Sequence, residues 1–270
     1  MPTINVNGVE LFYSEQGNGS ETMVFAHGLL MDSSMWDFVA PEFADVYRVI
    51  CFDFRGQGQS RHPGHGFSID NLVKDTAALI QALTDRPVHY VGLSMGGMVG
   101  MPLAARYPEL LRSLILLDTS AQAEPTKNKI KYALMTAVVK TFGVKALTSR
   151  TLPLMFGAST MKNPAMRELV NHWKHKLDGL KKSITGPVSG VTRRRDATQE
   201  LVKIICPTFI MVGEEDRTTP VSCARHIHVH IPHSELKIIP LCGHSSALEK
   251  PGQVLVAMKD FYSRLFFAAG

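Results

Sequence analysis

Ser94 lies between Gly92 and Gly96 in the pattern G-x-S-x-G, which suits a serine nucleophile. The apolar run 88–93 before it is typical of a buried strand, and a helical pattern starts near Met95. The glycines fit a turn so tight that strand and helix nearly touch. Such a turn lifts the hydroxyl clear of the sheet, and the Met95 amide at the helix N-terminus would stabilise an oxyanion. The alternative interpretation is an ordinary glycine-rich loop.

A serine hydroxyl needs a base to accept its proton and an acid to orient that base. After a strand–turn–helix serine, the chain order is acid and then histidine. The expected strand 208–213 is followed by three acidic residues, Glu214, Glu215 and Asp216. Of the eleven histidines, His244 alone lies in a Gly-flanked loop between the last expected strand and the final helical pattern.

A second amide donor to the oxyanion is expected in the loop after an early strand. The segment H-G-L-L-M follows the apolar run 24–27, and the amide of Leu29 is the candidate. His27 in the same loop is interpreted as a structural residue that organises the loop.

Other motifs predict no separate chemistry. His226 and His230 share an expected helix without an acidic or cysteine partner nearby, so we expect no metal site. The glycines of 53–60 follow the wrong strand for a nucleotide-binding loop, and Arg55 is expected to form a structural ion pair. The arginine run 193–195 is interpreted as a solvated edge. We expect no cofactor.

Short apolar runs alternate with helical patterns along most of the chain. Their Val, Ile, Leu and Phe content without strict alternation predicts buried strands. These runs are 24–27, 48–53, 88–93, 113–118, 208–213 and 236–241. Apolar stripes predict helices over 68–84 and 252–266. The alternation predicts an α/β fold with a doubly wound, mostly parallel sheet, and the Asn7-Gly8 pair predicts an antiparallel hairpin at its edge.

The alternation stops at about residue 122 and resumes at about 206, with helical patterns between. We therefore predict a core formed by 1–121 and 197–270, with a helical cap, 122–196, inserted between two strands. Two helical faces of the cap are expected to be buried. The first consists of Ile130, Leu134, Ala137, Val138 and Phe142, and the second of Met166, Leu169, Val170, Trp173 and Leu177.

The net charge of +5 is concentrated in the predicted cap, which holds 15 Lys and Arg against 4 Asp and Glu, a net charge of +11. Solvated helix faces would explain this excess. A positive field that attracts anionic substrates is the alternative. The basic residues are scattered and no recognition motif accompanies them, so we expect no nucleic-acid partner.

The length of 270 residues and the 45% hydrophobic content suit one domain with a sizeable core. The polar opening M-P-T-I-N-V-N-G-V-E lacks signal-peptide features, and no apolar run approaches the ~18–20 residues of a membrane span. We therefore expect a cytoplasmic protein without a membrane partner, and the oligomeric state is left open. Cys51, Cys206, Cys223 and Cys242 lack CxxC spacing and are interpreted as reduced thiols.

The ordered motifs N-G-x-x-L-x-Y, H-G-L, S-S-M-W-D, D-x-R-G-x-G-x-S, G-L-S-M-G-G-M-V-G, G-E-E-D-x-x-T-P and G-H resemble the α/β-hydrolase superfamily along the whole core. The segments HGLLMDSSMWD and GLSMGGMVG are most similar to the 3-oxoadipate enol-lactonase and bacterial arylesterase branch. The resemblance implies a catalytic triad of Ser94, His244 and Asp216, because the family places the acid before T-P. Glu215 is the fallback. The resemblance also implies an oxyanion hole formed by the N–H groups of Leu29 and Met95.

This resemblance predicts a serine hydrolase that cleaves a small carboxylic ester or lactone through an acyl-enzyme on Ser94, without a metal or cofactor. The basic cap suits a lactone that carries a free carboxylate. Two alternatives share the same residues: a cofactor-free perhydrolase, and a hydrolase-fold signalling receptor or regulatory partner with slow turnover. A serine at 94 argues against dehalogenases and epoxide hydrolases, which use an aspartate there.

Overall fold

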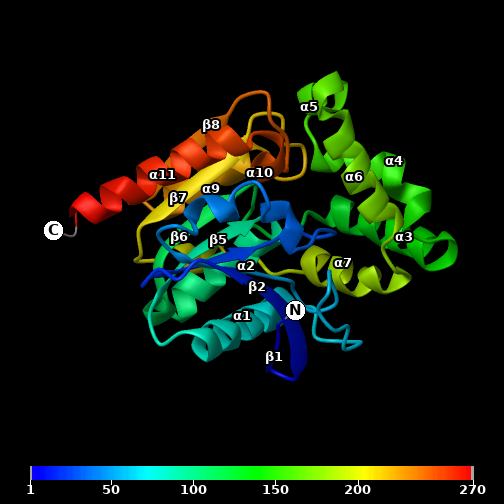
Figure 1. Cartoon of the computed structure of the whole chain (residues 1–270). Coiled ribbons are helices and arrows are strands. Elements are labelled where there is room, and N and C mark those ends of the chain that lie inside the picture. The colour runs from blue at the N-terminus through cyan, green and yellow to red at the C-terminus, as the bar shows by residue number, and fades with distance from the viewer. Residues whose placement is uncertain (1, 269–270) are drawn as a thin grey trace.

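One eight-stranded sheet runs through the molecule in the order β1-β2-β4-β3-β5-β6-β7-β8 (Figure 1). The computed structural model describes residues 2–268. The strands are β1 Thr3–Val6, β2 Val9–Gln16, β3 Thr22–Ala26, β4 Arg48–Phe52, β5 Val88–Leu93, β6 Leu111–Leu117, β7 Thr208–Gly213 and β8 Glu235–Ile239. Strand β2 pairs antiparallel with β1 and β4, and every other pairing is parallel. The predicted doubly wound, mostly parallel sheet is confirmed.

Helices cover both faces of this sheet. The helices of the described chain are α1 Ile69–Leu83, α2 Met95–Arg106, α3 Thr126–Phe142, α4 Thr148–Met155, α5 Ala158–Lys162, α6 Arg167–Asp178, α7 Thr185–Thr192, α8 Thr198–Leu201, α9 Val221–His230, α10 Ser246–Glu249 and α11 Pro251–Ala268. One apolar cluster joins the sheet to α1, α2 and α9. A second cluster joins the other face to α11, for example through Met258 and Phe261. The parallel strands are therefore buried from both sides, as their uniformly apolar sequences require.

The expected strands all form, with boundaries within two residues of the prediction. Strand β8 ends at Ile239 because Pro240 follows and has no N–H for the ladder. Helix α1 begins at the predicted place, and the Ser68 hydroxyl caps it by accepting from the amide of Asn71. The predicted edge hairpin is present, with Asn7 at φ 44° and Gly8 at φ 73°, as a tight turn between antiparallel strands requires.

Helices α3 to α7 follow β6 and precede β7, and they gather to one side of the sheet (Figure 1). These helices make up most of the segment 122–196, whose role as a separate cap stays a prediction. Of its two predicted faces, that of α6 is buried through Trp173 and Leu177.

The predicted face of α3 is wrong, because Ile130, Leu134 and Phe142 are 60%, 66% and 73% exposed. The helix instead turns Met135 and Val139 inward. Apolar residues lie on both sides of α3, so the helical spacing of the apolar residues in the sequence did not distinguish the packed face from the exposed one.

Within residues 2–268, no helix combines the length and the apolar character that crossing a membrane demands. The four cysteines lie within this range and all carry free thiols.

Candidate active site

Ser94 occupies a strained turn between β5 and α2. Its backbone has φ 52° and ψ −110°, outside the regions that non-glycine residues favour. A Cβ on Gly92 would lie 2.5 Å from the backbone of Gly96, and a Cβ on Gly96 would lie 2.3 Å from the carbonyl oxygen of Ala26. The two glycines are therefore required by the close approach of strand and helix, for the reason that the sequence suggested.

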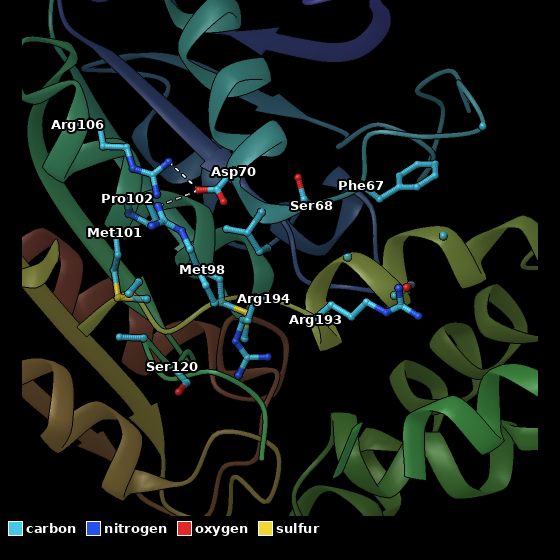
Figure 2. Close-up of a pocket in the computed structure, with 18 residues that line it drawn as sticks. Phe67, Ser68, Asp70, Met98, Met101, Pro102, Arg106, Ser120, Arg193 and Arg194 are labelled. Carbon is cyan, nitrogen blue, oxygen red and sulfur yellow. Dashed lines mark hydrogen bonds and ion pairs between the residues drawn. The ribbon is translucent and has the colours of Figure 1, made fainter. Parts of the chain in front are cut away.

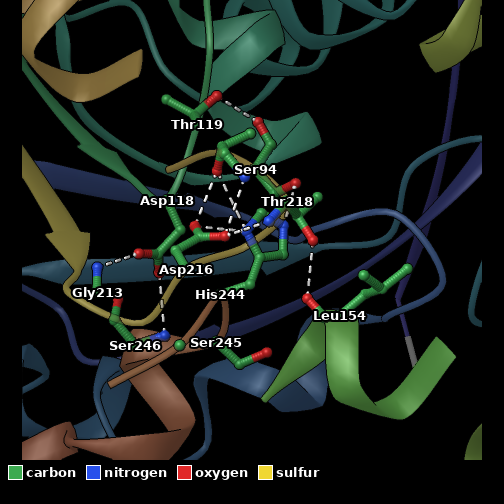
Figure 3. A network of polar contacts seen from close by, with 12 residues as sticks. Ser94, Asp118, Thr119, Leu154, Gly213, Asp216, Thr218, His244, Ser245 and Ser246 are labelled. Carbon is green, nitrogen blue, oxygen red and sulfur yellow. Dashed lines mark hydrogen bonds and ion pairs between the residues drawn. The ribbon is translucent and has the colours of Figure 1, made fainter. Parts of the chain in front are cut away.

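The structure brings the side chains of Ser94, His244 and Asp216 into one hydrogen-bonded chain (Figure 3). The Nε2 atom of His244 lies 2.9 Å from Ser94 Oγ, and its Nδ1 atom lies 2.8 Å from Asp216 Oδ2. All three side chains are buried. The arrangement allows Nδ1–H to donate to the carboxylate, which leaves Nε2 free to accept the serine proton.

The three acidic residues after β7 point in different directions. Glu214 Oε2 accepts from the amide of Leu241, and Glu215 accepts from the backbone and hydroxyl of Ser159. Of these three acids, Asp216 is the one that lies within hydrogen-bond distance of His244. Glu215, the fallback acid, instead connects the β7 loop to the segment 122–196.

Burial by itself lowers the pKa of His244, because it disfavours the imidazolium. The negative charge of Asp216 and its hydrogen bond to Nδ1 outweigh this effect, so the pKa of His244 lies above its ordinary value. The imidazolium that forms when His244 takes a proton is thus stabilised by its partner.

The two expected oxyanion donors lie beside Ser94. In the loop after β3, the amides of Gly28, Leu30 and Met31 each have an acceptor. No acceptor is found in residues 2–268 for the amide of Leu29, which lines the same pocket as Ser94. The amide of Met95 is the first of α2 and has no intrahelical acceptor.

His27 organises the loop that carries Leu29. It lies fully buried, its Nδ1 bonds to the carbonyl of Gly28 at 2.7 Å, and its Nε2 accepts from the amide of Phe54 at 3.0 Å. Burial lowers its pKa, so the ring is neutral, as these two bonds require. These contacts are those of a structural residue, in line with the interpretation from sequence.

Two neighbours of the Ser94–His244–Asp216 chain were not singled out from the sequence. They are Asp118, labelled in Figure 3, and Thr219. Asp118 follows β6, is fully buried, and accepts from the amides of Gly213 and Ser246. Burial, together with the charge of Asp216, raises its pKa to about 7. The Thr219 hydroxyl lies 2.9 Å from Asp216 Oδ2. The T-P pair after the acidic residues, Thr219-Pro220, was the sequence feature that could have pointed to Thr219.

Glu249 on α10 was also missed. Its buried carboxylate accepts from the amides of Gly243 and Ser245, the residues on either side of His244. It also accepts from the amide of Gly157, in the turn between α4 and α5. Glu249 therefore fixes the loop of His244 against the segment 122–196.

A pocket of about 160 Å³ opens beside Ser94 and His244. Its wall is mainly apolar and includes Leu29, Met135, Val139, Leu147, Met155 and Ile184. Arg194 is the only arginine or lysine among the described lining residues, and its guanidinium lies 2.9 Å from Glu124, which also lines the pocket.

The prediction that the arginine run 193–195 is solvated is wrong for Arg194. This residue is buried, and it also donates to the carbonyls of Gln122 and Val191. Its neighbours Arg193 and Arg195 are exposed, as predicted. The positive charge of 122–196 therefore reaches the Ser94 pocket through one residue that is already paired.

The remaining motifs have structural contacts. Arg55 forms the expected buried ion pair, with Asp75. His226 lies on α9, where its Nε2 bonds to the Thr198 hydroxyl and its carbonyl bonds to His230. In residues 2–268, no group of three or more His, Cys, Asp or Glu side chains could hold a metal ion.

Comparisons with known proteins agree with this architecture. Residues 21–251 match the family model described as alpha/beta hydrolase fold. The chain is similar to 3-oxoadipate enol-lactonase 2 of Acinetobacter baylyi, at 26% identity over 250 residues, which cover 92% of this chain and 91% of that protein.

Two solved structures are closely similar. A thermophilic esterase from Thermogutta terrifontis, solved with malate bound, has a TM-score of 0.90 and 26% identity, covering 98% of this chain and 99% of its own. The enol-lactonase from Burkholderia xenovorans LB400 has a TM-score of 0.90 and 24% identity, covering 97% and 100%, and supports the fold alone. The resemblance seen in the sequence motifs is therefore confirmed, and this chain belongs to the α/β-hydrolase fold family.

Proposed function

We propose that this protein hydrolyses a small, uncharged carboxylic ester or lactone through an acyl-enzyme on Ser94. The observation that carries the proposal is the hydrogen-bonded chain from Ser94 Oγ through His244 to Asp216, at 2.9 and 2.8 Å, beside an apolar pocket. Its similarity to an enol-lactonase and an esterase supports the same chemistry.

In the proposed reaction, His244 Nε2 takes the Ser94 proton while Oγ attacks the substrate carbonyl carbon. The N–H groups of Leu29 and Met95 donate to the oxyanion, an effect worth roughly 10²–10³ in rate per donor. His244 then protonates the leaving alkoxide, which departs as the alcohol. A water loses its proton to His244 and attacks the acyl-enzyme carbonyl. The tetrahedral intermediate then collapses, His244 returns the proton to the leaving Ser94 Oγ, and the acid product is released.

The pocket supports an uncharged substrate. The one arginine among the described residues of its wall, Arg194, is paired with Glu124, and the rest of that wall is mainly apolar. A substrate carboxylate entering this pocket would lose its hydration without finding a free cation, which is costly. The hypothesis that a cap arginine or lysine binds an anionic substrate in this pocket is therefore not supported.

A pH-stat assay tests the proposal, because it counts released acid and treats esters and lactones alike. The panel contains short aryl esters, neutral lactones and carboxylate-bearing lactones, measured with the wild type, Ser94→Ala and Ser222→Ala. We expect Ser94→Ala to lose on the order of 10⁶ in kcat, by analogy with other serine triads. Ser222 is exposed on α9 and is the matched control.

Acid release that depends on Ser94 and not on Ser222 would support the hydrolase, and the ranking of substrates would choose between esterase and lactonase. Turnover that survives in Ser94→Ala would contradict the mechanism. The absence of Ser94-dependent acid release across the panel would favour the perhydrolase and receptor alternatives.

A further inference from the structure

A second cavity, of about 410 Å³, adjoins the Ser94 pocket (Figure 2). Its wall comes from the start of α1, the middle of α2, α7 and the segment 193–197. Met98 and Arg194 line both cavities, so the two spaces are neighbours that share these side chains. The proposed hydrolysis uses no other residue of this second cavity.

Four arginines and one carboxylate line the second cavity. Two of the arginines are held by shared acids: Arg106 lies 2.8 Å from Asp70 and 2.6 Å from Glu200, and Arg195 lies 3.0 and 2.8 Å from the same two groups. Figure 2 shows Arg106 turned toward Asp70. Burial raises the pKa of Asp70, but the hydrogen bonds of both arginines outweigh this effect and lower it, which favours the ionised carboxylate.

Arg193 is the arginine of this cavity that forms no ion pair with the described acidic residues. Arg194 pairs with Glu124, while Arg193 has no acidic partner within residues 2–268. The adjacent acid, Asp196, instead accepts from the amide of Thr198. The four arginines thus face three carboxylates, and the unbalanced positive charge belongs to Arg193, which Figure 2 shows on the side of the cavity near Phe67.

The rest of the cavity wall is mainly apolar, apart from the serines Ser68, Ser120 and Ser189. It includes Phe67, Ile69, Met98, Met101, Pro102 and Ala121. An inorganic anion would use the guanidinium and leave this surface uncovered, whereas a neutral molecule would leave Arg193 unpaired. A ligand with one carboxylate and a short hydrocarbon body satisfies both parts of the wall.

We propose that the second cavity binds a small aliphatic or aromatic monocarboxylate, with its carboxylate on Arg193 and its hydrocarbon part on the α2 methionines. A guanidinium suits a carboxylate because its parallel N–H groups match the two oxygens. The acid released by ester hydrolysis belongs to this chemical class, as do free carboxylic acids from other sources. The binding does not require that the proposed hydrolysis be correct.

Methionine methyl groups report separately on the two cavities. Met101 lines only the second cavity, whereas Met135 and Met155 line only the Ser94 pocket. We would label the methionine methyls with ¹³C and titrate the full chain with hexanoate, with its neutral analogue hexanamide, and with inorganic phosphate. The variants are Arg193→Gln and, as the matched control, Arg225→Gln, which replaces an exposed arginine of α9 outside both cavities.

We expect hexanoate, but neither hexanamide nor phosphate, to shift the Met101 methyl at low concentration. Removing one charge-assisted contact should weaken this binding about tenfold in Arg193→Gln and leave it unchanged in Arg225→Gln. Shifts confined to Met135 and Met155 would place the carboxylate in the Ser94 pocket and overturn the proposal. The proposal would also be overturned if hexanoate caused no shift, if both variants bound it equally, or if hexanamide or phosphate caused equal shifts.

A kinetic experiment separates the two sources of the carboxylate, and it rests on the proposed function. Hexanoate acting from the second cavity should change the kcat for a neutral ester in the wild type and in Arg225→Gln, but not in Arg193→Gln, because Met98 and Arg194 belong to both walls. An effect on KM alone, identical in all three proteins, would mean that the acid acts only as a product in the Ser94 pocket. If no ester is hydrolysed, the methyl shifts still decide whether the second cavity binds.

Discussion

His244 Nε2 lies 2.9 Å from Ser94 Oγ, although 150 positions separate the two residues in the chain. Ser94 follows β5 and His244 follows β8, with β6 and β7 between these strands in the sheet. The four strands are parallel, so their carboxyl ends meet at one edge of the sheet. The contact therefore depends on the whole sheet from β5 to β8 and on the loops that follow its strands.

The acid that orients His244 can be identified by replacing each candidate carboxylate with the corresponding neutral amide. We expect Asp216→Asn to lower kcat by about 10⁴, because the amide favours the wrong imidazole tautomer. Glu215→Gln should change kcat far less, since Glu215 contacts Ser159 and not His244. Single-turnover and steady-state ester hydrolysis would measure both. A larger loss from Glu215→Gln would reverse the assignment.

The pH dependence of hydrolysis should follow His244. As the general base it must be neutral, so kcat/KM should fall as the pH drops through its raised pKa. The negative charge of Asp118 contributes to this rise, and Asp118→Asn should therefore move the acidic limb to lower pH. A pH profile of kcat/KM measures the shift, with the exposed Asp85→Asn as the control. An unmoved limb in Asp118→Asn would show that this charge does not act on the base.

The Ser94 turn should tolerate no side chain at Gly96. An alanine Cβ would lie 2.3 Å from the backbone oxygen of Ala26, so we expect Gly96→Ala to lower the free energy of unfolding by about 1–3 kcal/mol or more. Gly252→Ala is the control, because its Cβ meets nothing within 4 Å and lies in α11, where alanine is favoured. Urea titration compares them, and equal stability of the two variants would contradict the close approach of α2 to the end of β3.

The loop of His244 should depend on Glu249. In Glu249→Gln, the glutamine side chain has only one acceptor oxygen. It therefore cannot accept from the backbone N–H groups of Gly157, Gly243 and Ser245 as the two carboxylate oxygens do. We expect a loss of about 1–3 kcal/mol in stability and a lower kcat. The acidic limb of kcat/KM should also move to lower pH, because the charge of Glu249 contributes to the raised pKa of His244. The exposed Glu109→Gln is the matched control. Wild-type kcat in Glu249→Gln would mean that the loop holds His244 without this anchor.

Substrate charge should decide turnover in the Ser94 pocket. We expect dimethyl succinate to be hydrolysed with a kcat/KM at least about tenfold above that of monomethyl succinate, because the buried carboxylate finds no free cation. Glu124→Gln should narrow this ratio by releasing Arg194 from its ion pair. A ratio near one in the wild type would indicate that the pocket accepts anions after all.

The sequence by itself was sufficient for the sheet, the turn of Ser94 and the position of His244. These features are local: apolar runs of strand length, two glycines around a serine, and a histidine in a loop between a strand and a helix. Each of them restricts the backbone within a few residues, so the pattern can be recognised without knowing what packs against it. The choice of Asp216 over Glu215 came from family resemblance, since three adjacent acids are locally equivalent.

Only the tertiary structure decided which of those acids meets His244, which side of α3 is buried, and how Arg194 is used. The turn after β7 directs neighbouring side chains to opposite sides, so Glu215 contacts Ser159 while Asp216 contacts the histidine. Arg194 pairs with Glu124, and Glu249 holds Gly157, across 70 and 92 positions of the chain. Such contacts depend on how separate elements pack, because a charge or an apolar face acquires its role from a partner that no short stretch of sequence contains.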